Sequence, residues 1–311
     1  MNSNWLVRSR LKTRHLLLLV ALDEQRNVHR ASELLAMSQP AVSKLLMDLE
    51  EALQVQLFVR GSRGVTPTWY GETLIRHSRM VLSTLDKAHE EIQSRRAGLS
   101  GVVNIGTIVG PTTTTLPLAL QEMNERFPKV QINVTMDLSN VLLAHLSAGK
   151  LDFVIGRLFE EDDKHLYGFE RLGTEPLALV VRSGHPLAKA KNLKLDQVLK
   201  QSWVLPPSGG ALRHQFDLAF RKSGLAPPKN GVETLCLSLL TGLLLSSDMV
   251  AILSTSVAEI YVKHQMFSYL PVEFNCNVGD YGLITLEGVT LSPSTQTFMT
   301  LLREKASSLS A

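Results

Sequence analysis

A short polar edge near the amino terminus is the part of this sequence best suited to chemistry with another molecule. On a helix that turns by roughly 100° per residue, one side of this segment carries Gln39, Pro40, Ser43, Lys44 and Met47. An amide, a hydroxyl and an ammonium group near a helix N-terminus can hydrogen-bond to base edges and phosphates in a DNA major groove. These residue types at this spacing therefore predict a DNA-binding surface.

An amphipathic helix must position this polar edge. Ser38 is a favourable N-cap residue, and Pro40 falls in the first turn, where its missing N–H costs nothing. The apolar residues on the opposite side are Val42, Leu45, Leu46, Leu49 and Leu53. We therefore expect a helix that runs to about Ala52, here called the reading helix, with one face packed and the other free.

Two further helices and a wing are predicted around the reading helix. The preceding helix carries Ala31, Leu34 and Leu35 at i, i+3 and i+4, so it can lie across the reading helix with a small residue at the closest approach. A third helix is expected beneath both, at 16–22. A strand at 56–60, a glycine turn at 61–64 and the segment 65–67 indicate a wing. A helix pair alone would also fit an ordinary αα-hairpin, but the cap, the polar face and the Arg-flanked glycine loop together disfavour it.

The same residues resemble a known family, the LysR-type transcriptional regulators of bacteria. The phrase SQPAVSKLLMDLEEALQVQLFVR, followed by RGVTPTWYGETL, is similar to the winged helix-turn-helix signature of that family almost position by position. The family commonly has Ser at the position of Asn27, Ser or Thr at that of His29, and Arg at that of Lys44. Asn27 can cap a helix as Ser would, and Lys44 still brings a cation to phosphate, without the bidentate grip of Arg on guanine.

The expected DNA-contacting residues lie on three elements. They are Asn27, His29 and Arg30 at the preceding helix, Ser38, Gln39, Pro40, Ser43 and Lys44 at the reading helix, and Arg60 and Arg63 in the wing. We expect the wing arginines to contact the DNA backbone.

Length, composition and charge agree with such a protein. A chain of 311 residues has room for two or three domains, and 44% hydrophobic with 20% charged residues is typical of a soluble globular chain. Residues 1–97 hold 14 Lys and Arg against 10 Asp and Glu, whereas the remainder holds 18 against 19. The positive excess therefore lies where phosphates are to be bound. Cys236 and Cys276 are expected to pack in the core, without a disulfide or a metal site.

No targeting or membrane segment is expected. The basic residues at 8–14 followed by the apolar run 16–22 could be misread as a signal peptide, but Asp23 to Arg26 follow without a small-residue cleavage pattern. The longest later apolar run, 235–245, is interrupted by Ser238, Thr241 and Gly242 and is too short to span a bilayer. We expect the protein to act in the cytoplasm.

A single long helix is predicted from Thr68 to about Gln93. Its apolar stripe consists of Leu74, Val81, Leu82, Leu85, Ala88 and Ile92, with Arg76, Arg79, Lys87, Glu90 and Glu91 off the stripe. Pairing with a second copy would bury the stripe and set two reading helices at a fixed separation, although packing on its own chain is an alternative. In LysR-type regulators the matching helix dimerises, and members are usually tetramers. Residues 95–101 then indicate a hinge.

Alternating strands and helices follow Gly101, which predicts a mainly parallel sheet covered by helices. Strands are expected at 102–105, 130–136, 153–155, 177–182, 203–205, 249–253 and 281–286, and helices at 117–125, 141–148, 212–222, 235–246 and 294–305. This order resembles the family's effector domain, which has two α/β lobes joined by two crossover strands, like a periplasmic binding protein. TEPLALVVRSGHPLA is also typical of the family.

The predicted architecture is therefore multidomain. An all-α winged helix-turn-helix domain (1–67) and a linker helix (68–97) precede a two-lobed α/β domain (98–311), with lobe I at about 102–171 and 273–305 and lobe II at about 172–272.

Ligands of such folds bind at the carboxyl ends of strands, where helix N-termini present free N–H groups. Loops at 106–115, 137–140, 156–157 and 206–210 meet that description. The expected effector-binding residues are Thr107, Ile108, Thr112, Ser139, Arg157, Ser208, Gly209 and Arg213. Each has an ordinary alternative, because Thr runs cap helices and Arg side chains pair with acids.

Two functions of different class remain. The first is a DNA-binding transcriptional regulator that responds to a small-molecule effector; the resemblance implies a homodimer or homotetramer and RNA polymerase as a further partner. The second is a solute-binding protein or a lobe-closing enzyme with an incidental helical extension. The motifs H-E-x-x-H, G-x-S-x-G, G-x-G-x-x-G, CxxC and the P-loop are absent from the sequence, so we expect no enzyme, no catalytic or metal-binding residues and no cofactor. Weak similarity to family members that regulate sugar uptake and aromatic-acid breakdown leaves the effector open.

Overall fold

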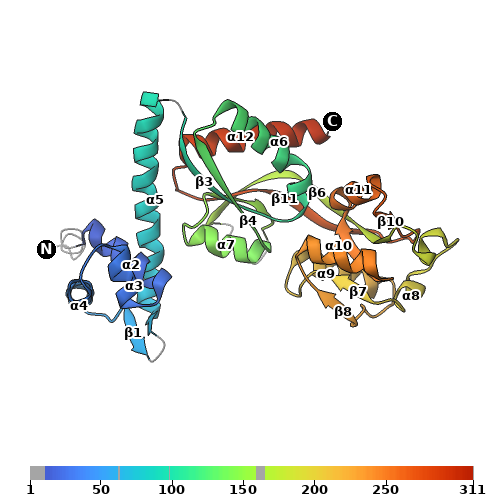
Figure 1. The fold of residues 1–311 in the computed structure, drawn as a ribbon, viewed down its shortest axis with the longest axis horizontal. Helices are drawn as coiled ribbons and strands as arrows, with labels where there is room; N and C mark the ends of the chain where they lie inside the picture. Colours follow the sequence, from blue (N-terminus) through green and yellow to red (C-terminus); the bar gives the residue numbers. More distant parts are fainter. Residues whose placement is uncertain (1–10, 62–63, 98, 159–164, 311) are drawn as a thin grey trace. The chain divides into compact units, whose positions relative to one another are not determined.

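The computed structural model describes residues 11–61, 64–97, 99–158 and 165–310. The chain forms two compact units, which are described separately (Figure 1). The first consists of the chain before Leu99 together with Ser147–Lys150 and Thr290–Ser292, and the second consists of the rest.

The first unit contains the expected helices and wing. Its elements are α2 (Thr13–Gln25), α3 (Val28–Leu34), α4 (Gln39–Leu53), β1 (Phe58–Gly61), β2 (Gly64–Pro67) and α5 (Trp69–Ala97). Helix α4 is the predicted reading helix, and Ser38 Oγ caps it by accepting from the backbone N–H of Ala41 at 3.4 Å. Strands β1 and β2 pair antiparallel, and β1 begins two residues later than expected.

One apolar core holds these elements together. Its buried members are Leu18, Leu19, Ala21, Leu22, Ala31, Val42, Leu45, Leu46, Leu49, Leu57, Phe58, Val65 and Ile75. Ala31 is fully buried between helices, as expected for a small residue at a close approach. The prediction that Leu34 packs here is wrong, because α3 is only seven residues long and Leu34, at its end, remains 60% exposed.

Three hydrogen bonds donated by backbone N–H groups fix the wing to the helices. Glu50 Oε1, on α4, accepts from the N–H groups of Leu57 at 2.7 Å and Phe58 at 3.1 Å. Val65 donates its N–H to the carbonyl of Arg26 at 3.0 Å. Gly64 is required there, because its φ is +117° and an added Cβ would lie 2.1 Å from the same carbonyl oxygen.

Helix α5 is a 29-residue helix that packs against α2. Arg79 was expected off its apolar stripe, and we find it only 8% exposed, donating from Nη2 to Asp23 Oδ2 at 2.7 Å and from Nη1 to Glu24 Oε1 at 2.9 Å. Burial opposes its charge, but the hydrogen bonds to Glu24 and Asp23 outweigh burial and raise the pKa of Arg79. A periodicity argument could not identify these partners, which lie more than fifty residues away in sequence.

The second unit is built on one mixed sheet. Its strands are β3 (Gly101–Thr107), β4 (Val130–Met136), β5 (Phe153–Gly156), β6 (Tyr167–Arg182), β7 (Trp203–Leu205), β8 (Gly231–Glu233), β9 (Val250–Ser254), β10 (Phe267–Tyr269) and β11 (Cys276–Leu286). The order is β4-β3-β5-β11-β6-β9-β7-β8, with β10 paired to β6. Pairing is parallel around β3 and around β7, as predicted. It is antiparallel wherever β6 or β11 takes part, so the expectation of a mainly parallel sheet holds only at the two ends.

Helices cover this sheet. They are η1 (Gly110–Thr113), α6 (Thr115–Arg126), α7 (Ser139–Ser147), η2 (Pro186–Lys189), α8 (Leu195–Val198), α9 (Ala211–Lys222), α10 (Leu237–Ser246), α11 (Thr255–Lys263) and α12 (Pro293–Ser310). Helices α6 and α12 pack against each other. The sequence did not predict α11, β8 or β10, because each is short or lacks a clear apolar period.

Separate apolar clusters lie at the two ends of the sheet. One includes Leu142, Leu146 and Val154, and the other includes Trp203, Phe216 and Phe220 with edge-to-face and tilted ring contacts. Cys276 is buried in the second cluster as expected, and burial raises the pKa of its thiol to about 11. The same expectation is wrong for Cys236, which is exposed at the N-cap of α10.

Among the described helices, none combines the length and the apolar character needed to cross a membrane. Within the same residues, no cluster of His, Cys, Asp and Glu side chains could hold a metal ion.

We expect Arg79→Ala to loosen α2. The change leaves the carboxylates of Asp23 and Glu24 without their buried counter-charge, which costs about 2 kcal/mol because both acids keep some contact with water. Amide hydrogen exchange of α2, followed by mass spectrometry of the full chain, should accelerate by roughly thirtyfold. Arg76→Ala, an exposed change on the same helix, is the matched control and should leave exchange unchanged; equal exchange in both variants would contradict the buried ion-pair role.

Candidate nucleic-acid interface and effector site

The outer face of α4 presents the predicted polar edge to solvent. Gln39, Pro40 and Lys44 are exposed and Ser43 is half-buried. On the opposite face Val42 and Leu49 are buried in the core. The burial pattern therefore agrees with the two-sided helix expected from the sequence.

Two of the expected DNA-contacting side chains cap helices of the protein itself. Ser38 caps α4, and Asn27 Oδ1 caps α3 by accepting from the N–H groups of His29 at 2.8 Å and Arg30 at 3.2 Å. The side-chain oxygen of Asn27 is therefore engaged within the protein, which leaves its Nδ2 group for an outside partner. These caps fix where the first turns of both helices begin.

The ends of three elements meet beside these caps. A shallow depression is lined by Asn27, His29 and Gln39 together with Gly61 and Gly64 of the wing. Arg30 is exposed, as is His29, whose Nε2 lies 3.6 Å from Glu33 Oε1. Arg60 belongs to β1, but its side chain, like the whole of Arg63, lies outside the described residues.

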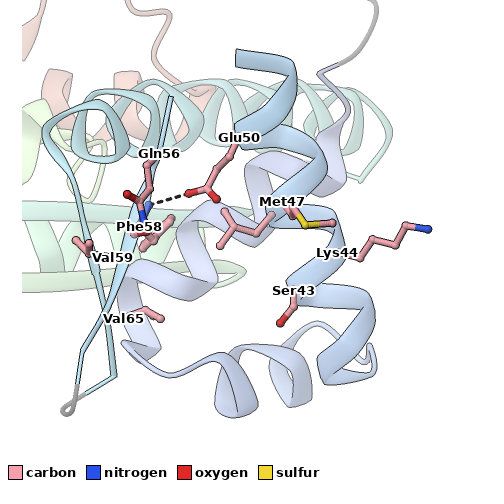
Figure 2. A pocket seen from close by; sticks show the side chains of 9 residues that line it. Ser43, Lys44, Met47, Glu50, Gln56, Phe58, Val59 and Val65 are labelled. Carbon is pink, nitrogen blue, oxygen red and sulfur yellow. Dashed lines mark hydrogen bonds between the residues drawn. The ribbon is translucent and has the colours of Figure 1, made fainter. Parts of the chain in front are cut away.

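A second and larger groove lies between α4 and the wing (Figure 2). Its volume is about 640 Å³, and its lining residues are Ser43, Lys44, Leu46, Met47, Glu50, Gln56, Phe58, Val59 and Val65. The sequence placed Met47 on the polar edge of the reading helix, but Met47 was not among the predicted DNA-contacting residues. Val59 was not predicted either, because local periodicity does not show which wing residues line a groove beside α4.

The expected effector-binding residues fall into two groups. The first surrounds the ends of β3 and β5, where Thr107, Ser139 and Arg157 are buried and Ser139 Oγ accepts from the backbone N–H of Arg157 at 3.1 Å. Thr107 Oγ1 donates to the carbonyl of Ile108, and Thr112 Oγ1 to that of Val109. Ile108 is buried in an apolar cluster, so its side chain contributes packing rather than hydrogen bonds.

A buried ion pair that the sequence did not predict dominates this first group. Arg157 Nη2 donates to Glu175 Oε2, and both side chains are at most 7% exposed. Arg157 Nε is buried without a hydrogen-bond partner. Burial and then the nearby Glu175 carboxylate raise the pKa of Tyr281, whose hydroxyl is hydrogen-bonded to Thr115. Glu175 lies on strand β6, 18 residues away from Arg157 in the sequence. Local periodicity therefore could not pair the two residues.

The second group lies at the start of α9. Arg213 donates to Glu233 Oε1 at 2.7 Å and to Asp217 Oδ1 at 3.1 Å, and Ser208 donates to Glu233 through both its N–H and its hydroxyl. The hydrogen bonds from Arg213 and Ser208 lower the pKa of Glu233. Gly209 is exposed with a φ of +89°.

The two groups approach each other through their loops. A Cβ added to Gly210 would lie 2.8 Å from Leu138 Cδ2, so the loop before α9 touches the loop before α7. The loop that holds Ser208 and Gly209 therefore lies against the residue before Ser139, and each arginine of the set already has a carboxylate partner.

We expect Glu175→Gln to destabilise the second unit by about 3 kcal/mol, because it leaves the buried guanidinium of Arg157 without a counter-charge. Differential scanning calorimetry of the full chain measures this loss. Arg157→Met combined with Glu175→Leu should recover most of it, since no buried charge then remains.

The exposed ion pair between Arg171 and Asp280 is the matched control. Asp280→Asn should change stability by less than about 0.5 kcal/mol. Equal effects of Glu175→Gln and Asp280→Asn would contradict the importance of the buried pair.

Both units of the chain match known protein families. Residues 13–72 match the family described as bacterial regulatory helix-turn-helix protein, lysR family, and residues 96–307 match the LysR substrate binding domain. The HTH-type transcriptional regulator GbpR of Azospirillum brasilense is 37% identical over 302 residues, covering 97% of this chain and 88% of the relative. PcaQ of Agrobacterium fabrum is 30% identical, covering 98% of each chain.

Solved structures show the same fold. A variant of full-length OxyR from Pseudomonas aeruginosa superposes with a TM-score of 0.69 at 20% identity, covering 94% of this chain and 98% of that one. Full-length CbnR in complex with its target DNA gives a TM-score of 0.66 at 21% identity, covering 95% and 100%. This chain belongs to the LysR family of transcriptional regulators, with an amino-terminal DNA-binding domain and a carboxyl-terminal effector-binding domain.

Proposed function

We propose that the exposed edge of α4 enters the major groove of promoter DNA through Gln39, Pro40, Ser43 and Lys44. The observation that supports this most is that the opposite face of the same helix is buried, so only this edge can face a partner. Asn27 and Ser38 hold the first turns of α3 and α4 against the DNA backbone. The phosphates are contacted by His29, Arg30, Arg60 and Arg63. We assign this role to residues 1–67.

We propose that α5, within the linker 68–97, joins two copies of the chain. Val81, Leu85 and Ile92 are exposed along the helix, and no described part of the chain covers them. Burying such a stripe against its counterpart would fix the separation of two reading edges, as a DNA site with two-fold symmetry requires. We further propose that the chain assembles into a homotetramer and that this regulator contacts RNA polymerase.

We propose that a small-molecule effector binds within residues 98–311, between lobe I (102–171 and 273–305) and lobe II (172–272). The expected lining comprises Thr107, Ile108, Thr112, Ser139, Arg157, Ser208, Gly209 and Arg213. The contact of Gly210 with Leu138 supports this set, because it brings loops from the two lobes together. The effector must have different affinities for two arrangements of the assembly if it is to change promoter activity.

This role needs neither catalysis nor a cofactor, and we propose that the protein is not an enzyme. We also propose that it acts in the cytoplasm, where bacterial promoter DNA lies.

Lys44→Ala should weaken binding to the DNA upstream of the gene for this chain. We expect a loss of roughly fivefold at low salt, since one charge-assisted hydrogen bond to phosphate contributes on the order of 1 kcal/mol. The slope of log K against log salt should fall by about 1, because one counterion fewer is released. Gel shifts over a salt series measure both.

Lys263→Ala, an exposed change on α11 in the second unit, is the control and should bind as the parent does. An unchanged slope in Lys44→Ala would remove Lys44 from the interface. A parent protein that ignores double-stranded DNA at low ionic strength would refute the proposed function as a whole.

A further inference from the structure

The groove between α4 and the wing contains an apolar surface that phosphate binding does not explain. Leu46, Phe58 and Val65 form its floor and are almost completely buried. Two further lining residues, Met47 on α4 and Val59 on β1, remain 58% and 44% exposed. Figure 2 shows Met47 beside Lys44 on α4, whereas the side chain of Val59 points away from α4. Met47 therefore offers an exposed apolar side chain on the same face of α4 as Ser43 and Lys44.

The acidic residue in the lining is directed to the protein's own backbone. Glu50 Oε1 accepts from the N–H groups of both Leu57 and Phe58, so this carboxylate holds the wing to α4. The groove therefore offers a mainly apolar surface, and its lining includes one cation, Lys44, whose side chain extends away from the wing in Figure 2.

The groove is continuous with the DNA-reading edge. Ser43 and Lys44 belong to both, and Met47 follows Ser43 by four residues, so the two side chains lie on the same face of α4 one turn apart. A partner that contacts Ser43 and Lys44 along the helix therefore meets Met47 next. This continuity favours DNA over a protein as the occupant.

We propose that Met47 reads thymine by packing against its 5-methyl group in the major groove. This inference rests on the proposed DNA-binding role of α4. Thymine is the base that presents a methyl group in the major groove, and apolar side chains recognise it by contact. The flexible thioether of Met47 can adapt its shape to that methyl group.

Replacing thymine by uracil in the upstream DNA removes methyl groups and leaves every hydrogen-bonding group in place. We expect the parent protein to bind the uracil duplex at least about fourfold more weakly, the loss associated with one buried methyl or methylene group. Met47→Ala should bind the thymine duplex more weakly by a similar factor and should no longer distinguish the two duplexes. Fluorescence anisotropy at one fixed salt concentration measures all four affinities.

Leu239→Ala, an exposed apolar change on α10, is the control and should keep the preference of the parent. Equal binding of both duplexes by the parent, or equal weakening of both by Met47→Ala, would overturn the methyl contact and leave the DNA-binding role intact. Failure of the parent to bind either duplex would overturn that role and this inference together.

Discussion

The burial of one face of α4 is the constraint on which the rest of the amino-terminal unit depends. Val42, Leu45, Leu46 and Leu49 are at most 6% exposed in a core shared with α2, α3 and the wing. Burying one Leu or Val side chain is worth roughly 1.5–3 kcal/mol, so turning the helix about its axis would cost several kcal/mol. The polar edge consequently has one orientation, whatever its residues then bind.

Polar contacts extend this constraint to the neighbouring elements. Glu50 holds the wing to α4, Gly64 allows the wing to approach the end of α2, and Arg79 joins α5 to α2. The reading edge, the wing and the linker helix are thus tied to one core. In the second unit Arg157 and Arg213 are likewise each paired with a carboxylate. An anionic effector that bound either arginine would compete with Glu175 or Glu233.

The sequence predicted what local periodicity and capping determine. The cap at Ser38, the two faces of α4 and most strands of the second unit follow from residue types and spacing over one or two turns. It could not predict pairings between distant residues. Arg79 was expected off the apolar stripe of its helix and Arg157 in the effector site. Neither expectation indicated their carboxylate partners, Asp23 and Glu175. Leu34 and Cys236 looked like core residues, but they lie where a helix ends or begins at the surface.

Hydroxyl-radical footprinting with and without the upstream DNA tests most directly whether the outer face of α4 meets DNA. We expect that, at low ionic strength and saturating DNA, oxidation of the peptide spanning residues 38–47 falls severalfold. Oxidation of the exposed Leu239 and Ile260 in the second unit should stay the same. Unchanged oxidation of the 38–47 peptide in a protein that has bound DNA would contradict the account, because another surface would then be making the contact.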